Sequence, residues 1–200
     1  MTKEELIQKI ILAFKDLKLE DGIGLWEGQG LDDYATPEEC KKLREKDEKD
    51  NCQQIPVVDL YKCSSSLSFF DAKGMRFHLA PFLLSSLNVF KVEEDQLREN
   101  GLLLKDYPAP DIVFTLSSEI VFTLTYDLES EYNIKQFSLL NTAQLQCIIH
   151  FLEYKQQEMI EYYQDFYFKE YGTDPSAVYS DEDYLKLEEA KQIWKKKLES

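Results

Sequence analysis

The chain has 200 residues, of which 44% are hydrophobic and 30% charged, and its 38 acidic and 23 basic residues give a formal net charge of −15. This composition is typical of one globular domain, and it excludes collagen-like, disulfide-dense and wholly disordered chains. No stretch approaches the roughly 18 uncharged apolar residues that a membrane span needs. Because an acidic field repels phosphate groups and anionic lipid, we expect neither nucleic-acid nor membrane partners, whereas a basic protein would be attracted.

Helices are predicted in the first quarter of the chain. The spacing of apolar residues predicts an amphipathic helix over residues 3–18. Thr36-Pro37-Glu38-Glu39 has the pattern of a capping box with proline at the first helical position, and it predicts a charged helix that runs to about Asp50. Between them, residues 20–34 hold four of the seven glycines and are predicted as a long irregular loop.

Two pairs of short segments are predicted as strands. Residues 67–70 and 75–79 flank a turn-forming tetrapeptide, and the second segment alternates between apolar and polar residues. Residues 112–116 and 120–125 are rich in β-branched and aromatic residues, and the polar residues between them suggest a hairpin. Pro81 is predicted to open a short apolar helix.

The last third of the chain is predicted to be helical. Asn141 begins a helix of about 30 residues that Gly172 ends, and residues 180–183 cap a final helix with a basic end. Together the elements predict an α+β fold, with a small antiparallel sheet, flanking helices and a C-terminal helical hairpin. We expect a single domain over residues 1–200, with a core over about 1–160 and a helical extension over about 142–200.

The cysteines and the N-terminal sequence indicate a reducing compartment. No two cysteines have the C-x-x-C spacing of a zinc knuckle or a redox pair. The first residues enter an amphipathic helix directly, without the basic and apolar regions of an export signal. We therefore expect a cytoplasmic protein with reduced thiols. The four cysteines are Cys40, Cys52, Cys63 and Cys147.

Motifs for catalysis, metals and nucleotides are missing from the sequence. The two histidines, His78 and His150, lie outside metal-binding motifs, and there is no G-x-S-x-G elbow. The pair Gly22 and Gly24 is a fragment of a phosphate loop with acidic neighbours and no Walker lysine. We predict no catalytic residue, no metal and no cofactor, although a Cys–His pair distant in the chain stays open.

Charged residues near the glycine-rich loop are candidate binding residues. Glu27, Asp32 and Asp33 could hold a divalent cation, but a solvated acidic loop is favoured. Arg76 lies between apolar residues, so we predict that it is half-buried and paired with Asp71, Asp32 or Asp33. It would then clamp the loop onto the sheet; recognition of an anionic ligand is the alternative.

Aromatic residues surround the end of the long helix on more than one side. Tyr162, Tyr163 and Tyr167 belong to this set. A lone amphipathic helix needs only one apolar face, so either the last helix or a partner protein covers the other. Tyrosine suits an interface because its ring is apolar and its tip polar.

Five motifs form a pattern over about residues 5–155. They are Asp21-Gly22-Ile23-Gly24-Leu25-x-Glu27, Asp32-Asp33-Tyr34, Phe69-Phe70-Asp71-x-x-Gly74-Met75-Arg76-Phe77-x-Leu79, Asp111-Ile112-Val113-Phe114 and Phe137-Ser138-Leu139-Leu140 with Gln144. This pattern resembles an uncharacterised bacterial domain-of-unknown-function family, and the resemblance implies no activity.

The sequence favours a non-catalytic, acidic, cytoplasmic protein-binding domain. Its most concrete form is an immunity-type inhibitor that masks a basic toxin with charge and a few aromatic anchors. Glu27, Asp32, Asp33 and residues 162–171 would be the contacts. The alternative is a small enzyme or ligand sensor with a pocket around Arg76 and His78, joined by Asp71 and Glu27. Self-association stays open.

Overall fold

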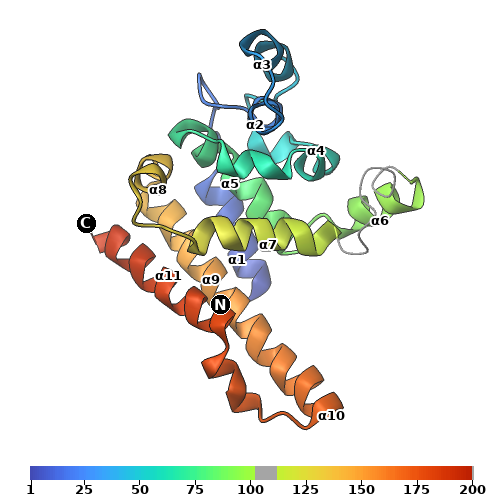
Figure 1. The fold of residues 1–200 in the computed structure, drawn as a ribbon, viewed down its shortest axis with the longest axis vertical. Coiled ribbons are helices and arrows are strands. Elements are labelled where there is room, and N and C mark those ends of the chain that lie inside the picture. The colour runs from blue at the N-terminus through green and yellow to red at the C-terminus, as the bar shows by residue number, and fades with distance from the viewer. Residues whose placement is uncertain (102–111, 200) are drawn as a thin grey trace.

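The described residues of the chain form helices and no strand (Figure 1). The structure is a computed structural model that describes residues 1–101 and 112–199, with side chains for all of these except 112–115. The predicted α+β class with its antiparallel sheet is therefore wrong. Asp111, part of one motif used for the resemblance, lies outside the described residues.

Eleven α-helices and four short 3₁₀ or π turns follow one another in the described ranges. None of these helices combines the length and the apolar character needed to cross a bilayer. The elements are α1 (Lys3–Ala13), α2 (Leu25–Asp32), α3 (Pro37–Arg44), η1 (Cys52–Gln54), α4 (Val57–Lys62), η2 (Ser64–Ser68), α5 (Ala72–Ser86), α6 (Lys91–Glu99), α7 (Ile112–Thr125), α8 (Glu131–Gln136), α9 (Thr142–Tyr162), η3 (Tyr163–Tyr167, a π turn), α10 (Phe168–Tyr171), η4 (Pro175–Ser180) and α11 (Glu182–Glu199).

Helix α5 is the centre of the molecule and replaces the predicted strand over residues 75–79. It packs against α1, α4, α7 and α8, and twelve of its fifteen residues are buried. A helix that is enclosed on every side carries no amphipathic stripe, so its apolar run gives no helical period. Pro81 lies inside this helix rather than at its start. Residues 67–70, the other predicted strand, lie in and after η2.

Helix α7 occupies the second pair of predicted strands. Its β-branched residues favour a strand locally, but packing against α5 and α11 overrides that preference. The hydroxyl groups of Thr123 and Thr125 donate to carbonyl oxygens four residues earlier, which satisfies them within the helix. Ser117, predicted as part of a turn, lies in mid-helix, and its hydroxyl is 2.7 Å from that of Ser86 in α5.

Local capping signals predicted the starts of helices correctly, whereas the helices expected to reach residue 18 and about Asp50 end earlier, at Ala13 and Arg44. The Thr36 capping box of α3 is confirmed, as is the start of α9 at Asn141, whose side chain accepts from the N–H of Gln144. Gly172 ends α10 with φ = +64°, as predicted. The predicted loop over residues 20–34 is only partly irregular, because it contains α2.

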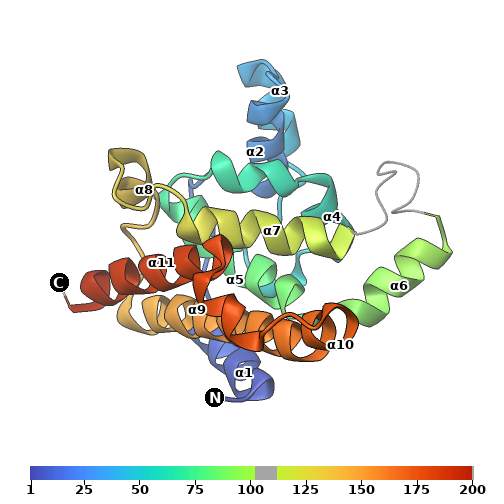
Figure 2. The same ribbon diagram turned by 60° about the horizontal axis from the view of Figure 1, so that its bottom comes forward.

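The C-terminal helix packs onto the same core as the rest of the chain. Figure 2 shows α11 beside α9, with α1 on another side of α9. Trp194 in α11 is fully buried, its indole N–H donates to the carbonyl of Leu124 at 2.9 Å, and its ring meets that of Phe137 edge to face. Beyond this contact, α9 continues through η3 into α10 as an arm that protrudes from the body (Figure 1). We call residues 162–171 the aromatic arm.

Candidate functional sites

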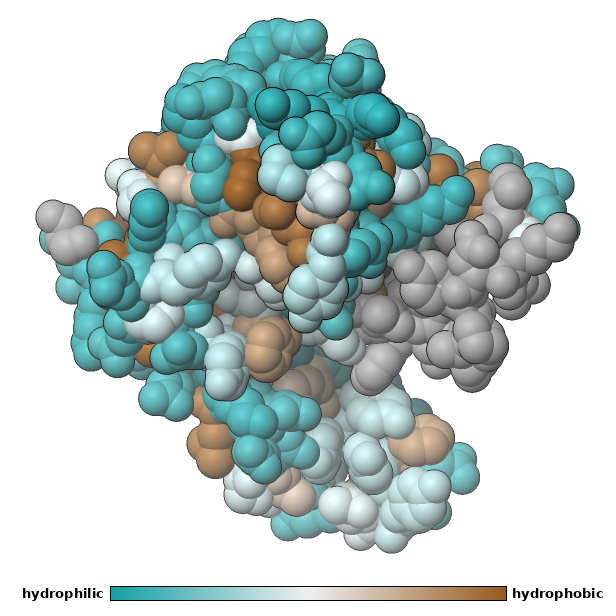
Figure 3. Space-filling model, turned by 45° about the horizontal axis from the view of Figure 1, so that its top comes forward, coloured by the Kyte–Doolittle hydropathy of each residue, from teal (hydrophilic) through white to brown (hydrophobic). Residues whose placement is uncertain are grey.

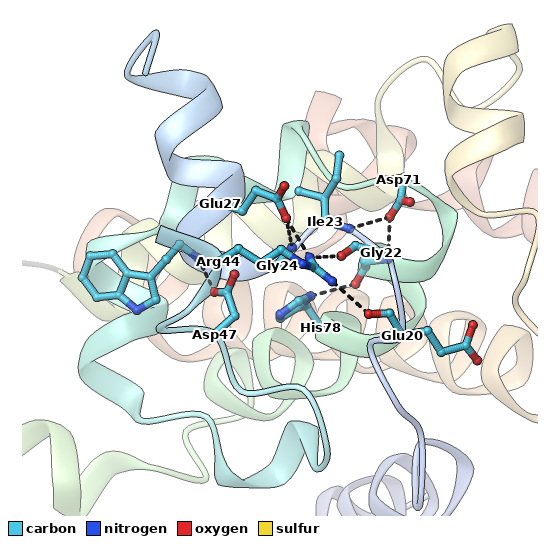
Figure 4. Close-up of polar contacts among 11 residues, drawn as sticks. Glu20, Gly22, Ile23, Gly24, Glu27, Arg44, Asp47, Asp71 and His78 are labelled. Carbon is cyan, nitrogen blue, oxygen red and sulfur yellow. Dashed lines mark hydrogen bonds and ion pairs between the residues drawn. The ribbon is translucent and has the colours of Figure 1, made fainter. Parts of the chain in front are cut away.

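Arg44, the last residue of α3, fastens the glycine-rich segment in place (Figure 4). Its guanidinium donates hydrogen bonds to the carbonyl oxygens of Gly22 and Glu20, the latter at 2.8 Å, and pairs with the carboxylate of Glu27 at 2.7 Å. The side chains of Arg44 and Glu27 are only 23% and 22% exposed. The planar fork of arginine suits three such acceptors, so this contact is a structural clamp.

Two of the predicted binding carboxylates cap helices. Glu27 accepts from the N–H of Gly24 at 3.2 Å, at the start of α2. Asp71 accepts from the N–H of Gly74 at 2.8 Å, in the first turn of α5, and from that of Ile23 at 3.0 Å. Both carboxylates therefore join the glycine-rich segment to its neighbours, which leaves them little capacity for a ligand.

Arg76 does not form the predicted clamp. The three partners predicted for it are Asp71, Asp32 and Asp33. Its guanidinium instead lies 3.8 Å from the carboxylate of Glu20, and its side chain is 24% exposed, so the half-burial is confirmed and the pairing is wrong. Asp32 and Asp33 both lie near the side-chain amide of Gln29, at 3.5 and 3.1 Å. Sequence reasoning missed Arg44, for which the only signal is that arginine is scarce.

His78 is buried in α5 and keeps one ring nitrogen unpaired. Its ring stacks on that of Phe70 at 4.4 Å and is fully shielded from solvent. Nδ1 lies 2.8 Å from the carbonyl oxygen of Gly74, which can only accept, so Nδ1 carries the proton. Burial lowers the pKa of His78 to about 4, which keeps the ring neutral at pH 7. Nε2 is then an acceptor, and none of the described residues pairs with it.

Asp47, which sequence reasoning did not single out, caps α2 from outside that helix. Its Oδ1 accepts from the N–H of Trp26 at 2.6 Å, while Oδ2 is buried with no partner among the described residues. A Cβ on Gly24 would lie 1.8 Å from Oδ2, so only glycine leaves room for this carboxylate. Asp47 is 7% exposed, and burial raises its pKa to about 6.

Asp47 and His78 line the same cavity, which has a volume of about 210 Å³. Figure 4 shows the two side chains next to Gly24, where α2 begins beside α5. Trp26 forms another part of the wall, and the ammonium of Lys46 lies 4.7 Å from its ring centroid. Arg76 does not line this cavity, so this cavity is not the predicted pocket around Arg76 and His78.

The predicted aromatic contacts come together in a second, larger hollow. A groove of about 740 Å³ lies between α7, α9, η3 and α11, and we call it the arm groove. Its aromatic lining is formed by Phe122, Tyr162, Tyr163 and Tyr167. Rings of the arm pack on one another, as Tyr162 does on Phe166 at 5.1 Å. These residues lie one helical turn apart, so the sequence was sufficient to group them.

The π turn η3 gives the arm groove a fixed polar contact. The Tyr163 hydroxyl donates to the carboxylate of Asp181 at 2.6 Å, across the loop between the arm and α11. This bond raises the pKa of Tyr163 to about 12 and lowers that of Asp181. Single π turns occur often at functional sites, and this one shifts the tyrosines relative to a regular helix.

The described residues hold no cluster of three or more His, Cys, Asp or Glu side chains that could bind a metal ion. All four cysteines are free and buried, and burial raises the pKa of Cys52 and Cys147 to about 11. Thiols with such raised pKa values are poor nucleophiles at neutral pH. The second histidine, His150, lies 3.1 Å from the carboxylate of Glu153 on its own helix.

Comparison with known proteins gives one match. A family model described as "Family of unknown function (DUF6714)" matches residues 2–170. The matched region includes the aromatic arm up to residue 170 and ends before α11. No curated protein and no solved structure matches significantly.

Proposed function

The chain belongs to this family of unknown function, DUF6714, and we propose that it is a non-catalytic, acidic protein-binding domain of the cytoplasm. The observation that carries the proposal is the set of aromatic rings that the chain leaves uncovered beside the arm groove. Tyr162, Phe166 and Tyr171 are 51%, 40% and 69% exposed. Helix α11 packs on α9, and these rings nevertheless stay exposed.

Stacked aromatic rings suit the role of interface anchors. Their mutual contacts, such as Tyr162 on Phe166 and Phe166 against Tyr171, hold them in place before a partner binds. A pre-ordered ring loses little conformational entropy on binding and buries a large area. By contrast, side chains over α2 and α3, at the top of Figure 3, are mostly hydrophilic, and the exposed ring there is that of Tyr34.

The partner that fits best is a basic protein segment. The net charge of −15 attracts a basic surface, and three carboxylates line the arm groove against the two ammonium groups of Lys155 and Lys186. The three carboxylates are those of Glu158, Asp181 and Asp183. Arginine side chains stack on tyrosine faces and pair with carboxylates, so one residue type satisfies both features. The concrete form is an immunity-type inhibitor that masks the basic surface of a toxin.

The acidic residues predicted as contacts belong to another end of the molecule. Glu27 and Asp32 lie in α2 and Asp33 follows it directly, and α2 is far from α10 in Figure 1. They cannot contact the same small segment as the aromatic arm, so we assign them a role in long-range attraction only. The double variant Asp32→Asn, Asp33→Asn is then expected to slow association without changing the dissociation rate.

The experiment is capture of partners from native cells on the tagged protein at low and high salt, followed by a measured Kd with the purified partner. Tyr162→Gln with Phe166→Gln removes two exposed rings, and we expect at least thirtyfold weaker binding. Tyr34→Asn is the matched control, because Tyr34 is 96% exposed on the α2–α3 connection and asparagine tolerates its positive φ. Equal binding by all three proteins would refute the proposal.

The alternative of an enzyme or ligand sensor keeps only part of its predicted site. His78 lines a cavity, but Arg76 does not, and Glu27 and Asp71 are engaged in capping. Asp47, rather than the predicted Arg76, lines the cavity together with His78. A ligand sensor built on Asp47 and His78 is therefore the second candidate function, and the cavity of about 210 Å³ is the observation that favours it.

A further inference from the structure

The cavity beside α2 presents hydrogen-bond acceptors without a matching donor. Nε2 of His78 carries a lone pair and can only accept, because the proton of the ring is on Nδ1, which donates to a carbonyl oxygen. Oδ2 of Asp47 is a carboxylate oxygen, and neither atom has a partner among the described residues. Buried acceptors in native proteins are almost always paired. Lys46 and Gln54 line the same cavity, but no hydrogen bond joins them to these two acceptors, which therefore stay open to a donor from outside the chain.

The charge of the cavity wall narrows the choice of donor. Glu48 and Asp59 line the cavity together with Asp47, and among the described residues Lys46 is the one basic side chain on the same wall. The excess of carboxylates favours a positively charged donor over a neutral one. A metal ion would also take up lone pairs, but the described residues contain no cluster of three metal-binding side chains. An ammonium group needs only acceptors and negative charge, and both are present.

The size and the apolar part of the wall define the rest of the ligand. A cavity of 150 Å³ holds a molecule the size of benzene, so about 210 Å³ has room for a few more atoms. Leu25, Ile55 and Trp26 supply hydrocarbon and aromatic surface. Trp26 already carries the ammonium of Lys46 over its ring, which shows that the ring attracts such cations.

We propose that this cavity binds a small molecule through a primary ammonium group, which donates to Asp47 Oδ2 and His78 Nε2 while its hydrocarbon part lies against Trp26. The inference rests on the ligand-sensor alternative and not on protein binding. The cavity and the arm groove share no lining residue, so each can fail without the other.

The probe is n-butylammonium at pH 7.5, compared with 1-butanol and butyrate, which have the same chain length but are neutral and anionic. Titration of the full chain is followed by calorimetry and by the nitrogen chemical shift of His78 Nε2. We expect saturable binding of n-butylammonium at one site, a shift of Nε2, at least tenfold weaker binding of 1-butanol and no binding of butyrate.

Two variants test the residues. Asp47→Asn is expected to weaken n-butylammonium at least tenfold, whereas His150→Gln, which changes the other histidine, leaves its affinity unchanged. If Asp47→Asn does not fold, Trp26→Leu replaces it, because Trp26 is only half-buried, and it is expected to weaken binding several-fold. Circular dichroism confirms that each variant is folded.

Four results would overturn the proposal. The first is no saturable binding of n-butylammonium, which means that water alone fills the cavity. The second is equal affinity for 1-butanol. The third is Zn²⁺ that binds in the absence of amine and is lost in Asp47→Asn. The fourth is a tenfold gain in affinity in Lys46→Met, which means that Lys46 fills the cavity itself.

Discussion

The N-cap residue of α2, Gly24, has no side chain that could cap the helix, and Asp47 from a later segment supplies the cap instead. Asp47 accepts from the N–H of Trp26, twenty-one positions earlier, and Gly24 leaves the space that its carboxylate occupies. No local sequence pattern predicts such a contact, because the two residues that form it are far apart in the chain. Asp47 and Arg44 were missed for this reason, although they organise the segment in which the sequence placed its candidate site.

Gly24→Ala tests how closely Asp47 fits. The new Cβ would lie 1.8 Å from Oδ2 and 2.3 Å from Cγ, so the carboxylate must move away from α2. We expect a loss of about 3 kcal/mol in the free energy of unfolding, from overpacking and a broken charged hydrogen bond. Gly172→Ala, where only the positive φ is unfavourable, is expected to cost about 1 kcal/mol. Urea denaturation gives both values, and equal losses would contradict the fit.

Asp47→Asn tests the raised pKa of Asp47 through the pH dependence of stability. Because the carboxyl ionises near pH 4 in the unfolded chain and near pH 6 in the folded one, the folded state loses stability as the pH rises through this window. The shift corresponds to about 3 kcal/mol. Asparagine cannot ionise, so the stability of the variant relative to the wild type is expected to rise by about that amount from pH 4 to pH 7. A constant difference in urea denaturation would show that Asp47 is not shifted.

At the scale of elements, local capping signals predicted where helices begin or end. Buried helical segments, by contrast, could not be recognised as helices from the sequence. Thr36, Asn141 and Gly172 act through their own neighbours, so their roles could be read from the sequence. Residues 75–79 of α5 were predicted as a strand because they alternate between apolar and polar, and both segments of α7 because they are rich in β-branched residues. Only the packing of one on the other decides between the two conformations.

Arg44→Lys tests the clamp between α3 and the glycine-rich segment. A lysine ammonium cannot match the three acceptors that the guanidinium fork contacts, so a carbonyl oxygen loses its partner. We expect a loss of about 2 kcal/mol in stability. Arg76→Lys is the control, since Arg76 has one ion pair at 3.8 Å, and its loss is expected to stay below about 0.5 kcal/mol. If Arg76→Lys loses more stability than Arg44→Lys in thermal or urea unfolding, Arg76 and not Arg44 is the clamp.

At the scale of the whole molecule, the candidate contacts divide between its two ends. Three of the four tyrosines of the arm lie together on the arm groove because helical spacing groups them, and this part of the site could be predicted. The charged residues at the other end depend on which segments meet in the fold. There the sequence named Glu27, Asp71 and His78, which lie in one region (Figure 4), but grouped them with Arg76, whose guanidinium lies 3.8 Å from the carboxylate of Glu20 instead.

Trp194→Ala tests whether α11 is part of the core. The buried indole fills space beside Phe137 and pairs with the carbonyl of Leu124. Its removal is expected to cost about 4 kcal/mol, and Trp194→Phe, which keeps a ring but loses the N–H, about 1 to 2 kcal/mol. Leu185→Ala on the same helix is the control, because Leu185 is 51% exposed. A loss below 1 kcal/mol for Trp194→Ala would mean that α11 is undocked in solution.

The two tryptophans of the chain make its two ends spectroscopically distinct. Trp194 is sealed from solvent, so its emission is blue-shifted and protected from acrylamide quenching. Trp26 is half-buried in the wall of a cavity beside an ammonium group, so its emission is red-shifted and open to quenchers. Without any label, one fluorescence spectrum therefore reports separately on the docking of the last helix and on the contents of the cavity.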